Sequence, residues 1–412
     1  MLTQAPKGTS DILPENSGKW QYLEGLFRDI CRRYGMKEIR TPMFENTELF
    51  IRGVGDTTDV VEKQMYSFDD LAGRNITLKP EGTSPVARAL VENGLYAQMQ
   101  PTKLFYITPC FRYEKMQKGR YRQFHQFGTE VFGTKSPVAD AEIVGVAADM
   151  LAALGMKEIE LRINSVGCPE CRAKHREALK AFLAEKYDDL CETCKGRFNK
   201  NPMRILDCKS EKCQKLVEGA PMMLDYLCDD CKDHFEEFKS CLESMGIDYV
   251  VDPGIVRGLD YYTKTAFEFV SVREMAQGTV CGGGRYDHLV EDIGGPEVPG
   301  VGFGMGIERL LLLLDQEGIE IPSGDSADYV IITMSDEARA KGLGLARELR
   351  AKGFQVQTDM MNRNFKNQFK YANKINAKNA IIIGEDEVKN GNFAVKNMST
   401  GEQKICSSAE EL

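Results

Sequence analysis

The sequence predicts an α+β protein in which a core of mixed helices and strands carries a mostly helical insertion and is followed by a small α/β domain. Residues 104–110 and 158–163 alternate apolar and polar side chains, as half-buried strands do. A charged, cysteine-rich segment at about 168–245 then separates two stretches that are rich in strands and glycine turns. Residues 322–326, Pro-Ser-Gly-Asp-Ser, have the composition of a linker and mark off the last domain.

Helical periodicity predicts the first and the last helix of the core. Residues 22–34 form a helix that places Leu23, Leu26, Phe27 and Ile30 on one face. Residues 250–318 return to strands and glycine turns, and they close with a helix at 306–316.

The last domain begins with a buried strand at 329–332. Ser335 is a good helix N-cap, and the two acidic residues that follow it favour the positive end of a helix dipole. Gly353 ends this helix, and strands follow at 355–358 and 380–383 with a basic helix between them. Residues 388–395 are expected to form a hairpin around Asn390-Gly391, because that dipeptide favours a tight β-turn.

Composition and charge limit the possible functions. The chain has 412 residues, 42% of them hydrophobic and 28% charged, which suits two or three globular domains. The N-terminus lacks the long apolar run of a signal peptide, and the longest aliphatic block, residues 310–314, is too short to span a membrane, so a cytoplasmic location is expected. A net charge of −9 argues against a general coating of nucleic acid.

Basic residues are nevertheless concentrated in two segments. Residues 103–122 contain six basic residues and one acid, and residues 360–380 contain five basic residues and no acid. Either surface could bind a polyanion with salt-sensitive affinity. For the second segment, solvated lysines on a helix face are an equally simple explanation.

Residues 111–130 are the first candidate site and are predicted to form a strand, a basic loop and a returning strand. Side chains two apart on a strand share a face, so the returning strand should present an aromatic ring, an amide and a carboxylate together. Arg112 joins them from the outgoing strand, and this set suits phosphate, adenine and a polar cationic ligand. The residues on the returning strand are Phe124, Gln126, Gly128 and Glu130. His125 should point the opposite way and is interpreted as structural.

Three further elements support a ligand site. Residues 300–306 alternate glycine with apolar residues and lead into Arg309 one turn into a helix. Glycines within a strand indicate that a ligand or another backbone approaches closely, and the spacing is not that of a dinucleotide-binding fingerprint. Residues 78–84 form a turn that offers the carboxylate of Glu81 and the hydroxyl of Thr83, and the segments 256–263 and 281–287 complete the set.

Together these four elements resemble the histidyl-tRNA synthetases, a family of class II aminoacyl-tRNA synthetases. The resemblance covers nearly the whole chain, beginning with Lys7-Gly8-Thr9-Ser10-Asp11, and Arg257-Gly258-Leu259-Asp260-Tyr261-Tyr262 separates it from the related prolyl, threonyl and glycyl enzymes. It implies a class II catalytic core over residues 1–325, with an antiparallel sheet flanked by helices, and an α/β anticodon-binding domain over residues 327–412. It also implies a homodimer that is joined near Pro42.

The resemblance implies an ATP-dependent histidine–tRNA ligase. Histidine and ATP would give histidyl-adenylate and pyrophosphate, and histidine would then pass to the 3′ end of tRNA(His), with Mg²⁺ accompanying ATP. The implied catalytic residues are Arg112 at the α-phosphate, Arg309 at the γ-phosphate and Arg257 on the far side of the α-phosphate. Phe124 would stack on adenine and Glu114 would orient ATP.

The same resemblance implies the groups that bind histidine and tRNA. Residues assigned to the ammonium group of histidine are Glu81, Thr83 and Gln126, with Gly82 beside them. Glu130 and Tyr262 would bind the two imidazole nitrogens, with Tyr261 nearby and Arg257 also in contact with the amino acid. The tRNA contacts would come from Lys115, Gln117, Lys118, Arg120, Arg363, Lys366 and Lys370, with Lys374 and Lys378 on the same helical face. The family often has Arg-Pro where this chain has Lys115-Met116.

The cysteines of the insertion raise the possibility of zinc. The chain has thirteen cysteines, an odd number that excludes complete pairing, and most lie between Cys168 and Cys241. Four close pairs stand out, and the spacing between the first two pairs fits a zinc ribbon: Cys168/Cys171, Cys191/Cys194, Cys208/Cys213 and Cys228/Cys231. Structural zinc is possible but is not favoured, because histidyl-tRNA synthetases do not generally need zinc. The alternative is a reduced helical insertion that contacts the tRNA acceptor arm; His175 and His234 lie near the pairs and share this question.

Two other functions are compatible with parts of the sequence. The regulatory subunit of ATP phosphoribosyltransferase shares the catalytic fold but lacks the anticodon domain and degrades the motifs. An RNA-binding module without catalysis would have no use for the glycine strand and Arg309. Histidine-dependent exchange of pyrophosphate into ATP would distinguish all three.

Overall fold

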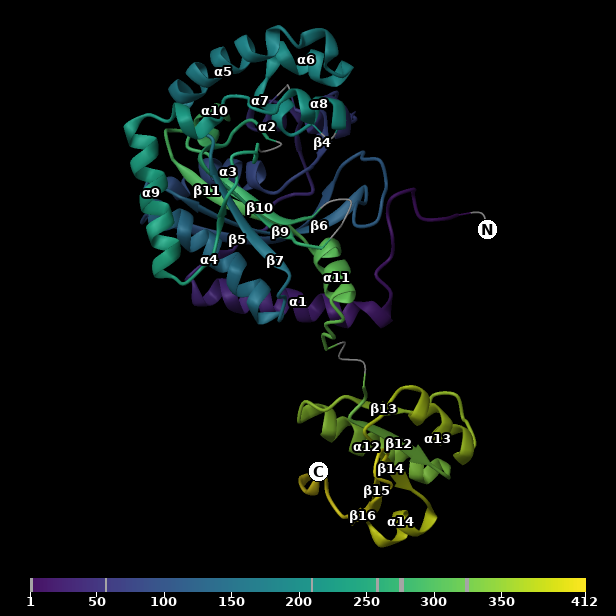
Figure 1. Cartoon of the computed structure of the whole chain (residues 1–412). Helices are drawn as coiled ribbons and strands as arrows, with labels where there is room; N and C mark the ends of the chain where they lie inside the picture. The colour runs from purple at the N-terminus through teal and green to yellow at the C-terminus, as the bar shows by residue number, and fades with distance from the viewer. Residues whose placement is uncertain (1–2, 56–57, 209, 257–258, 274–277, 323–325) are drawn as a thin grey trace. The chain divides into compact units, whose positions relative to one another are not determined.

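The computed structural model describes residues 3–55, 58–208, 210–256, 259–273, 278–322 and 326–412. The chain forms two compact units, one built on Trp20–Ile321 and the other on Pro322–Leu412. Figure 1 shows the elements of each unit. Within the described ranges, no helix is both long enough and apolar enough to pass through a membrane.

An eight-stranded sheet forms the centre of the larger unit. In spatial order its strands are β1 (Lys37–Glu38), β5 (Thr102–Phe111), β6 (Gln123–Phe132), β11 (Gly300–Gly306), β10 (Thr279–Arg285), β9 (Thr263–Ser271), β7 (Ile159–Ser165) and β8 (Val250–Val251). The two edge pairs, β1 with β5 and β7 with β8, are parallel, and all other neighbours are antiparallel. The predicted antiparallel sheet with flanking helices is confirmed.

One face of this sheet packs against long helices. The main core lies beneath α1 (Pro14–Arg33), α4 (Pro137–Ala153) and α11 (Ile307–Gln316). Phe27 of α1 stacks on Phe127 of β6 with 4.5 Å between the ring centroids, and both side chains are fully buried. Leu23 and Ile30 are also buried, as predicted, although the helix begins eight residues earlier, at Pro14 rather than at residue 22.

The opposite face of the sheet carries a second core, which includes Tyr106, Tyr262 and Tyr286. It packs against α3 (Thr83–Glu92) and α10 (Leu289–Asp292). Beside it lie a three-stranded sheet in the order β2 (Phe44–Asn46), β4 (Asn75–Leu78) and β3 (Tyr66–Asp69), together with α2 (Thr47–Val54), a π-helical turn at Val60–Gln64 and a 3₁₀ turn at Leu95–Ala97.

The insertion is mostly helical, as predicted. Its helices are α5 (Pro169–Ala184), α6 (Glu192–Lys200), α7 (Met203–Leu206), α8 (Glu211–Leu216) and α9 (Asp229–Ser244), with 3₁₀ turns at Tyr187–Asp189 and Met223–Tyr226. It leaves the sheet after β7, and α9 packs against α4 before the chain returns.

The C-terminal unit has a five-stranded sheet in the order β13-β12-β14-β15-β16. Its elements in sequence are β12 (Tyr329–Thr333), α12 (Asp336–Ala351), β13 (Val356–Thr358), α13 (Phe365–Lys374), β14 (Asn379–Ile383), α14 (Glu385–Asn390), β15 (Phe393–Asn397), β16 (Gln403–Cys406) and a 3₁₀ turn at Ala409–Glu411. β12 is parallel to both of its neighbours, and the remaining pairs are antiparallel. Ser335 caps α12 by accepting a hydrogen bond from the Ala338 amide at 3.2 Å.

The hairpin predicted at 388–395 is wrong. Residues 385–390 form helix α14, whose three acidic residues lie in the first turn, where the helix dipole favours them. Gly391 ends this helix in the left-handed conformation, with φ of 69°. The observed hairpin pairs β15 with β16, so Asn390-Gly391 is a helix C-cap rather than a β-turn.

Candidate active site

A cleft of about 420 Å³ opens beside the central sheet of the larger unit. Most of its lining comes from the β5–β6 hairpin, the end of β11 with the start of α11, the start of β10, the turn before α3 and residues 259–262. These are the segments that the sequence singled out as candidate sites. The volume falls in the range of small-ligand pockets.

Three arginines converge on one end of this cleft. Arg112 follows β5, donates from Nε to the carbonyl of Pro80 at 2.7 Å, and lies 5.4 Å above the ring centroid of Phe124. Arg309 enters from the first turn of α11, and Arg120 enters from the hairpin loop. All four side chains line the cleft.

The charges at this end favour an anion. Burial lowers the pKa of Arg309, and the positive charges of Arg120 and Arg112 lower it further, against the opposing effect of Glu114. The Glu114 carboxylate lies 3.1 Å from Arg120 and 3.9 Å from Arg112. One carboxylate is shared by a group of guanidinium ions, so a phosphate ligand would relieve their repulsion.

The other end of the cleft is lined by hydroxyl and carboxylate groups. The Glu81 carboxylate accepts hydrogen bonds from the amides of Thr83 at 2.7 Å and Ser84 at 2.8 Å, so it caps the N-terminus of α3. Gly82, the residue that precedes α3, packs so closely on Tyr106 that a Cβ there would collide with its ring. Glu81, Thr83 and Tyr106 all line the cleft.

Glu130 lies beneath this lining and is fully buried. Its carboxylate accepts hydrogen bonds from Thr83 Oγ1 at 2.8 Å, from the Tyr106 hydroxyl at 3.2 Å and from the Tyr286 hydroxyl. Burial raises the pKa of Glu130 to about 8, although the hydrogen bonds from Tyr286, Thr83 and Tyr106 act to lower it.

The glycines of the neighbouring strands make room for this buried group. Gly302 lies opposite Glu130 in the sheet, and a Cβ there would collide with the Glu130 carboxylate and the Thr129 carbonyl. Gly128 lies opposite Tyr106, and a Cβ there would collide with the tyrosine ring. The glycines were expected to mark the close approach of a ligand or another backbone. At these two positions the groups that come close include protein side chains.

The remaining residues predicted to bind histidine also lie at the cleft. Gln126, Tyr261 and Tyr262 line it, and the two tyrosine rings have centroids 4.7 Å apart. Gln126 accepts a hydrogen bond from the Cys110 thiol at 3.4 Å. Arg257, which the resemblance assigns to the α-phosphate, lies outside the described residues.

Tyr106 and Tyr286 were not predicted from the sequence, although they hold the Glu130 carboxylate. Tyr106 could have been found from the strand alternation, since it lies two residues from Thr108 and four from Cys110 on the face that carries the site. Tyr286 follows the end of β10, and its position next to Glu130 depends on the pairing of β10 with β11 and of β11 with β6.

The hairpin loop carries the residues predicted to contact the tRNA acceptor end. Lys115, Gln117 and Lys118 are exposed, whereas Arg120 is half-buried and pairs with Glu114. His125 donates through its backbone amide to Glu308 at 2.9 Å and packs edge-on against Trp20, so its side chain has structural partners.

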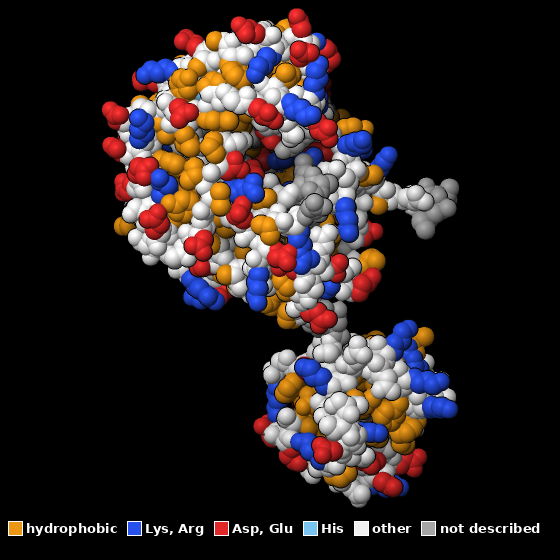
Figure 2. Space-filling view, viewed as in Figure 1, with side chains coloured by type: hydrophobic (Ala, Val, Ile, Leu, Met, Phe, Trp, Pro, Cys, Tyr) orange, Lys and Arg blue, Asp and Glu red, His pale blue; other side chains and the backbone are white. Residues whose placement is uncertain are grey.

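The basic helix of the C-terminal unit is shorter than predicted. Lys366, Lys370 and Lys374 lie on α13 and are exposed, at spacings of four residues. Arg363 lies before this helix and pairs with Asp359 at 2.6 Å, and Lys378 lies after it and pairs with Asp328 at 2.8 Å. The prediction that all five basic residues share one helical face is therefore wrong for Arg363 and Lys378, because the helix begins at Phe365 and ends at Lys374. Figure 2 shows Lys and Arg side chains gathered along one edge of this unit.

The eight candidate metal-binding cysteines come together as two groups of four: Cys168, Cys171, Cys228 and Cys231 form one, and Cys191, Cys194, Cys208 and Cys213 form the other. Neither nearby histidine belongs to a group. His175 donates to the carbonyl of Pro221 at 2.8 Å, and His234 lies 3.9 Å from the Asp140 carboxylate.

Comparisons with known proteins identify the family. The family model described as histidyl-tRNA synthetase matches residues 8–310, and the model of an anticodon binding domain matches residues 328–412. A protein named "Histidine--tRNA ligase" from Caldanaerobacter subterraneus subsp. tengcongensis is 60% identical over 403 residues, which is 98% of this chain and 97% of the relative. One from Clostridium perfringens with the same name is 56% identical over 404 residues, covering 98% and 96%.

A solved structure gives the same result at the level of the fold. The crystal structure of apo Staphylococcus aureus histidyl-tRNA synthetase matches with a TM-score of 0.84 at 40% identity, and the match covers 98% of this chain and 97% of that one. The chain belongs to the histidyl-tRNA synthetase family.

Proposed function

We propose that the chain is a histidine–tRNA ligase that uses ATP to form histidyl-adenylate and pyrophosphate and then transfers histidine to the 3′ end of tRNA(His). The observation that carries the proposal is a cleft with two chemically different ends. Three arginines at one end suit the triphosphate, and a buried carboxylate with hydroxyl partners at the other suits a small polar amino acid.

The adenylate is formed by positioning and charge neutralisation. The histidine carboxylate attacks the α-phosphorus of ATP, and pyrophosphate leaves, so the protein needs no nucleophile of its own. Arg112 and Arg309 neutralise the phosphates, Phe124 stacks on adenine and Glu114 orients the nucleotide, as supported by their places along the cleft. Mg²⁺ bound with ATP supplies further charge neutralisation. Arg257 is assigned to the α-phosphate as a further cation, and this assignment rests on the family resemblance alone.

Histidine binds at the opposite end. Glu81, Thr83 and Gln126 bind its ammonium group, and Glu130 and Tyr262 bind the imidazole nitrogens. A site built on buried hydrogen-bonding groups leaves those groups unpaired when an apolar amino acid enters, and such a site discriminates by a factor on the order of 10⁴. The position of Tyr262 at the cleft, and the hydrogen bond that joins Glu130 to Thr83 of the cleft lining, support this arrangement.

The tRNA contacts two surfaces. Lys115, Gln117, Lys118 and Arg120 face the acceptor end, and the lysines of α13 with Arg363 belong to an anticodon-binding domain over residues 327–412, in line with the family match there.

We also propose a cytoplasmic homodimer. Its interface would include the region near Pro42, where the neighbouring Met43 and Phe44 are 42% and 54% exposed and Phe68 of the same small sheet is 48% exposed. Exposed apolar groups of this kind favour burial against a second copy.

Pyrophosphate exchange tests the proposal. Purified protein with ATP, Mg²⁺ and labelled pyrophosphate should form labelled ATP only when L-histidine is added. Other amino acids serve as controls, and a protein with native circular dichroism that gives no histidine-dependent exchange would refute the ligase. The same result would favour the regulatory-subunit alternative.

A further inference from the structure

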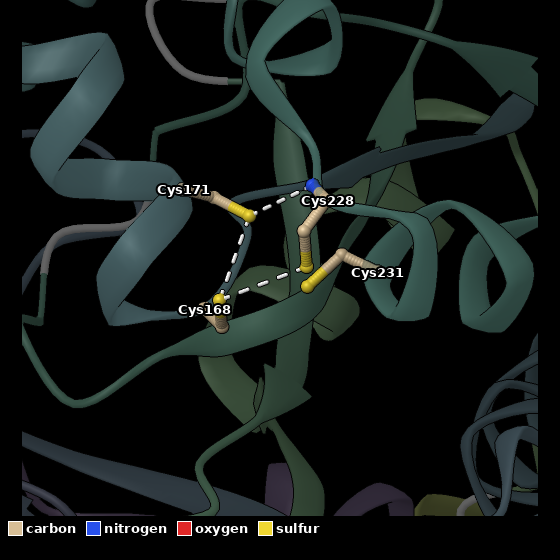
Figure 3. A group of neighbouring side chains, drawn as sticks. All are labelled: Cys168, Cys171, Cys228 and Cys231. Atoms are coloured by element: carbon tan, nitrogen blue, oxygen red, sulfur yellow. Dashed lines mark hydrogen bonds between the residues drawn. The ribbon is translucent and has the colours of Figure 1, made fainter.

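The helical insertion holds two compact groups of cysteines, and we infer that each group binds one structural zinc ion. The root site is formed by Cys168, Cys171, Cys228 and Cys231, whose side chains point toward one another in Figure 3. The tip site is formed by Cys191, Cys194, Cys208 and Cys213. The family resemblance alone disfavours zinc, but it does not account for this grouping.

The distances between sulfurs fit a tetrahedral zinc site. A Zn–S bond of about 2.3 Å in tetrahedral geometry separates the sulfurs by about 3.8 Å. In the root site, Cys168 Sγ lies 3.5 Å from Cys171 Sγ and 4.0 Å from Cys228 Sγ. In the tip site, Cys191 Sγ lies 3.9 Å from Cys208 Sγ. All sulfurs within a group are within 4.8 Å of one another, and none of these eight cysteines is in a disulfide.

The backbone around the cysteines suits the negative charge of zinc-bound sulfurs. Cys168 immediately precedes α5 and Cys171 lies in its first turn, and Cys228 and Cys231 are placed in the same way at α9. The positive ends of both helix dipoles therefore face the sulfurs of the root site. The amide of Cys228 also donates to Cys171 Sγ at 3.1 Å, a contact that orients a metal-bound sulfur.

The tip site has one cysteine pair at the start of a helix. Cys191 precedes α6 and Cys194 lies in its first turn, while Cys213 comes from the short helix α8. The Cys191 amide donates to Cys213 Sγ at 3.3 Å. Both sites therefore have a cysteine pair at the start of a helix and a backbone amide that donates to a sulfur, although the two sites lie in different parts of the insertion.

The two sites are nested along the chain. The root site joins the first and the last cysteine pair, so it closes the insertion at the point where the insertion leaves the core and returns to it. The tip site joins the two middle pairs. The zinc-ribbon spacing predicted that the first two pairs share a site, and this is wrong, because the fold places the first pair beside the fourth and the second pair beside the third.

The insertion has little else to hold its short helices. Helix α6 has nine residues and α8 has six, which is too short for independent stability in water. The apolar core around the tip site is small, with Leu179, Leu183 and Ile205 as its largest fully buried members, and cysteines make up much of the rest. Metal binding supplies folding free energy in small segments of this kind.

The tip site also has a consequence for the cleft. Arg197 of α6 pairs with Asp59 at 2.9 Å, and Asn201, just after α6, donates to Asp260 at 2.9 Å. Asp59 lines the cleft, as does Arg204 from α7. A zinc ion that holds α6 therefore also holds one wall of the cleft.

Metal content tests the inference directly. Full-length protein, purified without added zinc and without chelators, should contain two zinc ions per chain by inductively coupled plasma mass spectrometry. Zinc replaced by cobalt(II) should give the ligand-field and sulfur-to-cobalt charge-transfer bands of tetrahedral cobalt thiolate sites. Less than one metal ion per chain together with no such bands would overturn the inference, as would iron in place of zinc.

Paired variants assign the two ions. Cys191→Ser/Cys194→Ser should lower the content from two zinc ions to one. Cys168→Ser/Cys171→Ser should remove the other ion, and these counts need no activity. Cys241→Ser is the matched control, because Cys241 lies on α9 but outside both groups, and it should keep both ions. Two zinc ions retained in either double variant would show that the metal binds elsewhere.

Discussion

Replacing Glu130 with glutamine should make the larger unit more stable, and the gain should grow as the pH rises from 6 to 8. The carboxyl is fully buried and burial raises its pKa to about 8, compared with 4.5 for the free group. A raised pKa means that the folded state holds the proton more tightly than the unfolded state. The favourable contribution of this proton is complete below pH 4.5 and is lost as the pH rises toward 8.

The size of the effect follows from the shift. One pKa unit corresponds to about 1.4 kcal/mol, so relative to its stability below pH 4.5 the parent loses about 2 kcal/mol by pH 6 and about 4 kcal/mol by pH 8. Glutamine does not ionise, so the variant gains about 2 kcal/mol over the parent across this range. For a unit of roughly 300 residues this corresponds to a relative rise of about 3 °C in Tm.

Differential scanning calorimetry of both proteins at pH 6, 7 and 8 measures this change. The quantity to compare is how the difference in Tm between variant and parent changes with pH. Altered hydrogen bonding shifts Tm by the same amount at each pH, so it does not affect this change. Glu92→Gln makes the same chemical change at an exposed position and is the control. A Tm difference that stays flat or shrinks with rising pH would refute the assigned burial effect.

The same variant should lose activity while it gains stability. Loss of a charge-assisted hydrogen bond costs about 1.5–3 kcal/mol, so kcat/KM for histidine in pyrophosphate exchange should fall by about 10- to 100-fold. The KM for ATP should change little, because the hydrogen-bond partners of Glu130 are Thr83, Tyr106 and Tyr286 rather than the arginines of the cleft. Unchanged histidine kinetics would remove Glu130 from the histidine site.

Three further substitutions test other parts of the argument. Gly302→Ala should lower Tm, at a cost of about 1–3 kcal/mol, because its Cβ would overlap backbone, whereas Gly304→Ala, whose Cβ would lie 3.4 Å from the nearest atom, should leave Tm unchanged. Arg285→Lys should destabilise the larger unit by about 2–4 kcal/mol in thermal unfolding, because a lysine cannot replace all the bonds of the fully buried guanidinium, including that to Asp140. Arg257→Ala should lower the exchange rate far more than it weakens ATP binding measured by calorimetry; parent-like exchange would contradict its role.

Local sequence patterns were sufficient to predict most of the core. The alternation at 104–110 corresponds to part of β5, and the apolar spacing at 22–34 corresponds to the buried face of α1, because each pattern depends only on neighbours along one element. The hairpin expected at Asn390-Gly391 failed because the dipeptide suits both a β-turn and a helix C-cap. The acidic run at 385–387 decides in favour of the helix, because the helix dipole favours acidic residues in its first turn.

The residue types of the candidate site could be predicted from the sequence, but which of them lie buried beneath the cleft could not. The sequence placed Glu130 on the same strand face as Gln126, and the structure keeps that face, yet Gln126 lines the cleft while Glu130 lies beneath it. This difference arises in part from Tyr286, which follows strand β10 and reaches the carboxylate only after the sheet has formed. The cysteine groups likewise depend on contacts between distant segments.

Under the proposed function, the burial that costs stability at Glu130 also serves recognition of histidine. The imidazole ring of free histidine has a pKa of about 6.5, and burial brings the pKa of Glu130 to about 8, so both groups bind a proton in nearly the same pH range. A carboxylate with an ordinary pKa would already be ionised across this range, whereas Glu130 changes its protonation where the imidazole does. The glycine at position 302 is part of the same arrangement, because it admits the carboxylate and the Tyr286 hydroxyl to a dry layer of the sheet. Selectivity for one amino acid therefore depends on a residue that never lines the cleft, and on a missing side chain beside it.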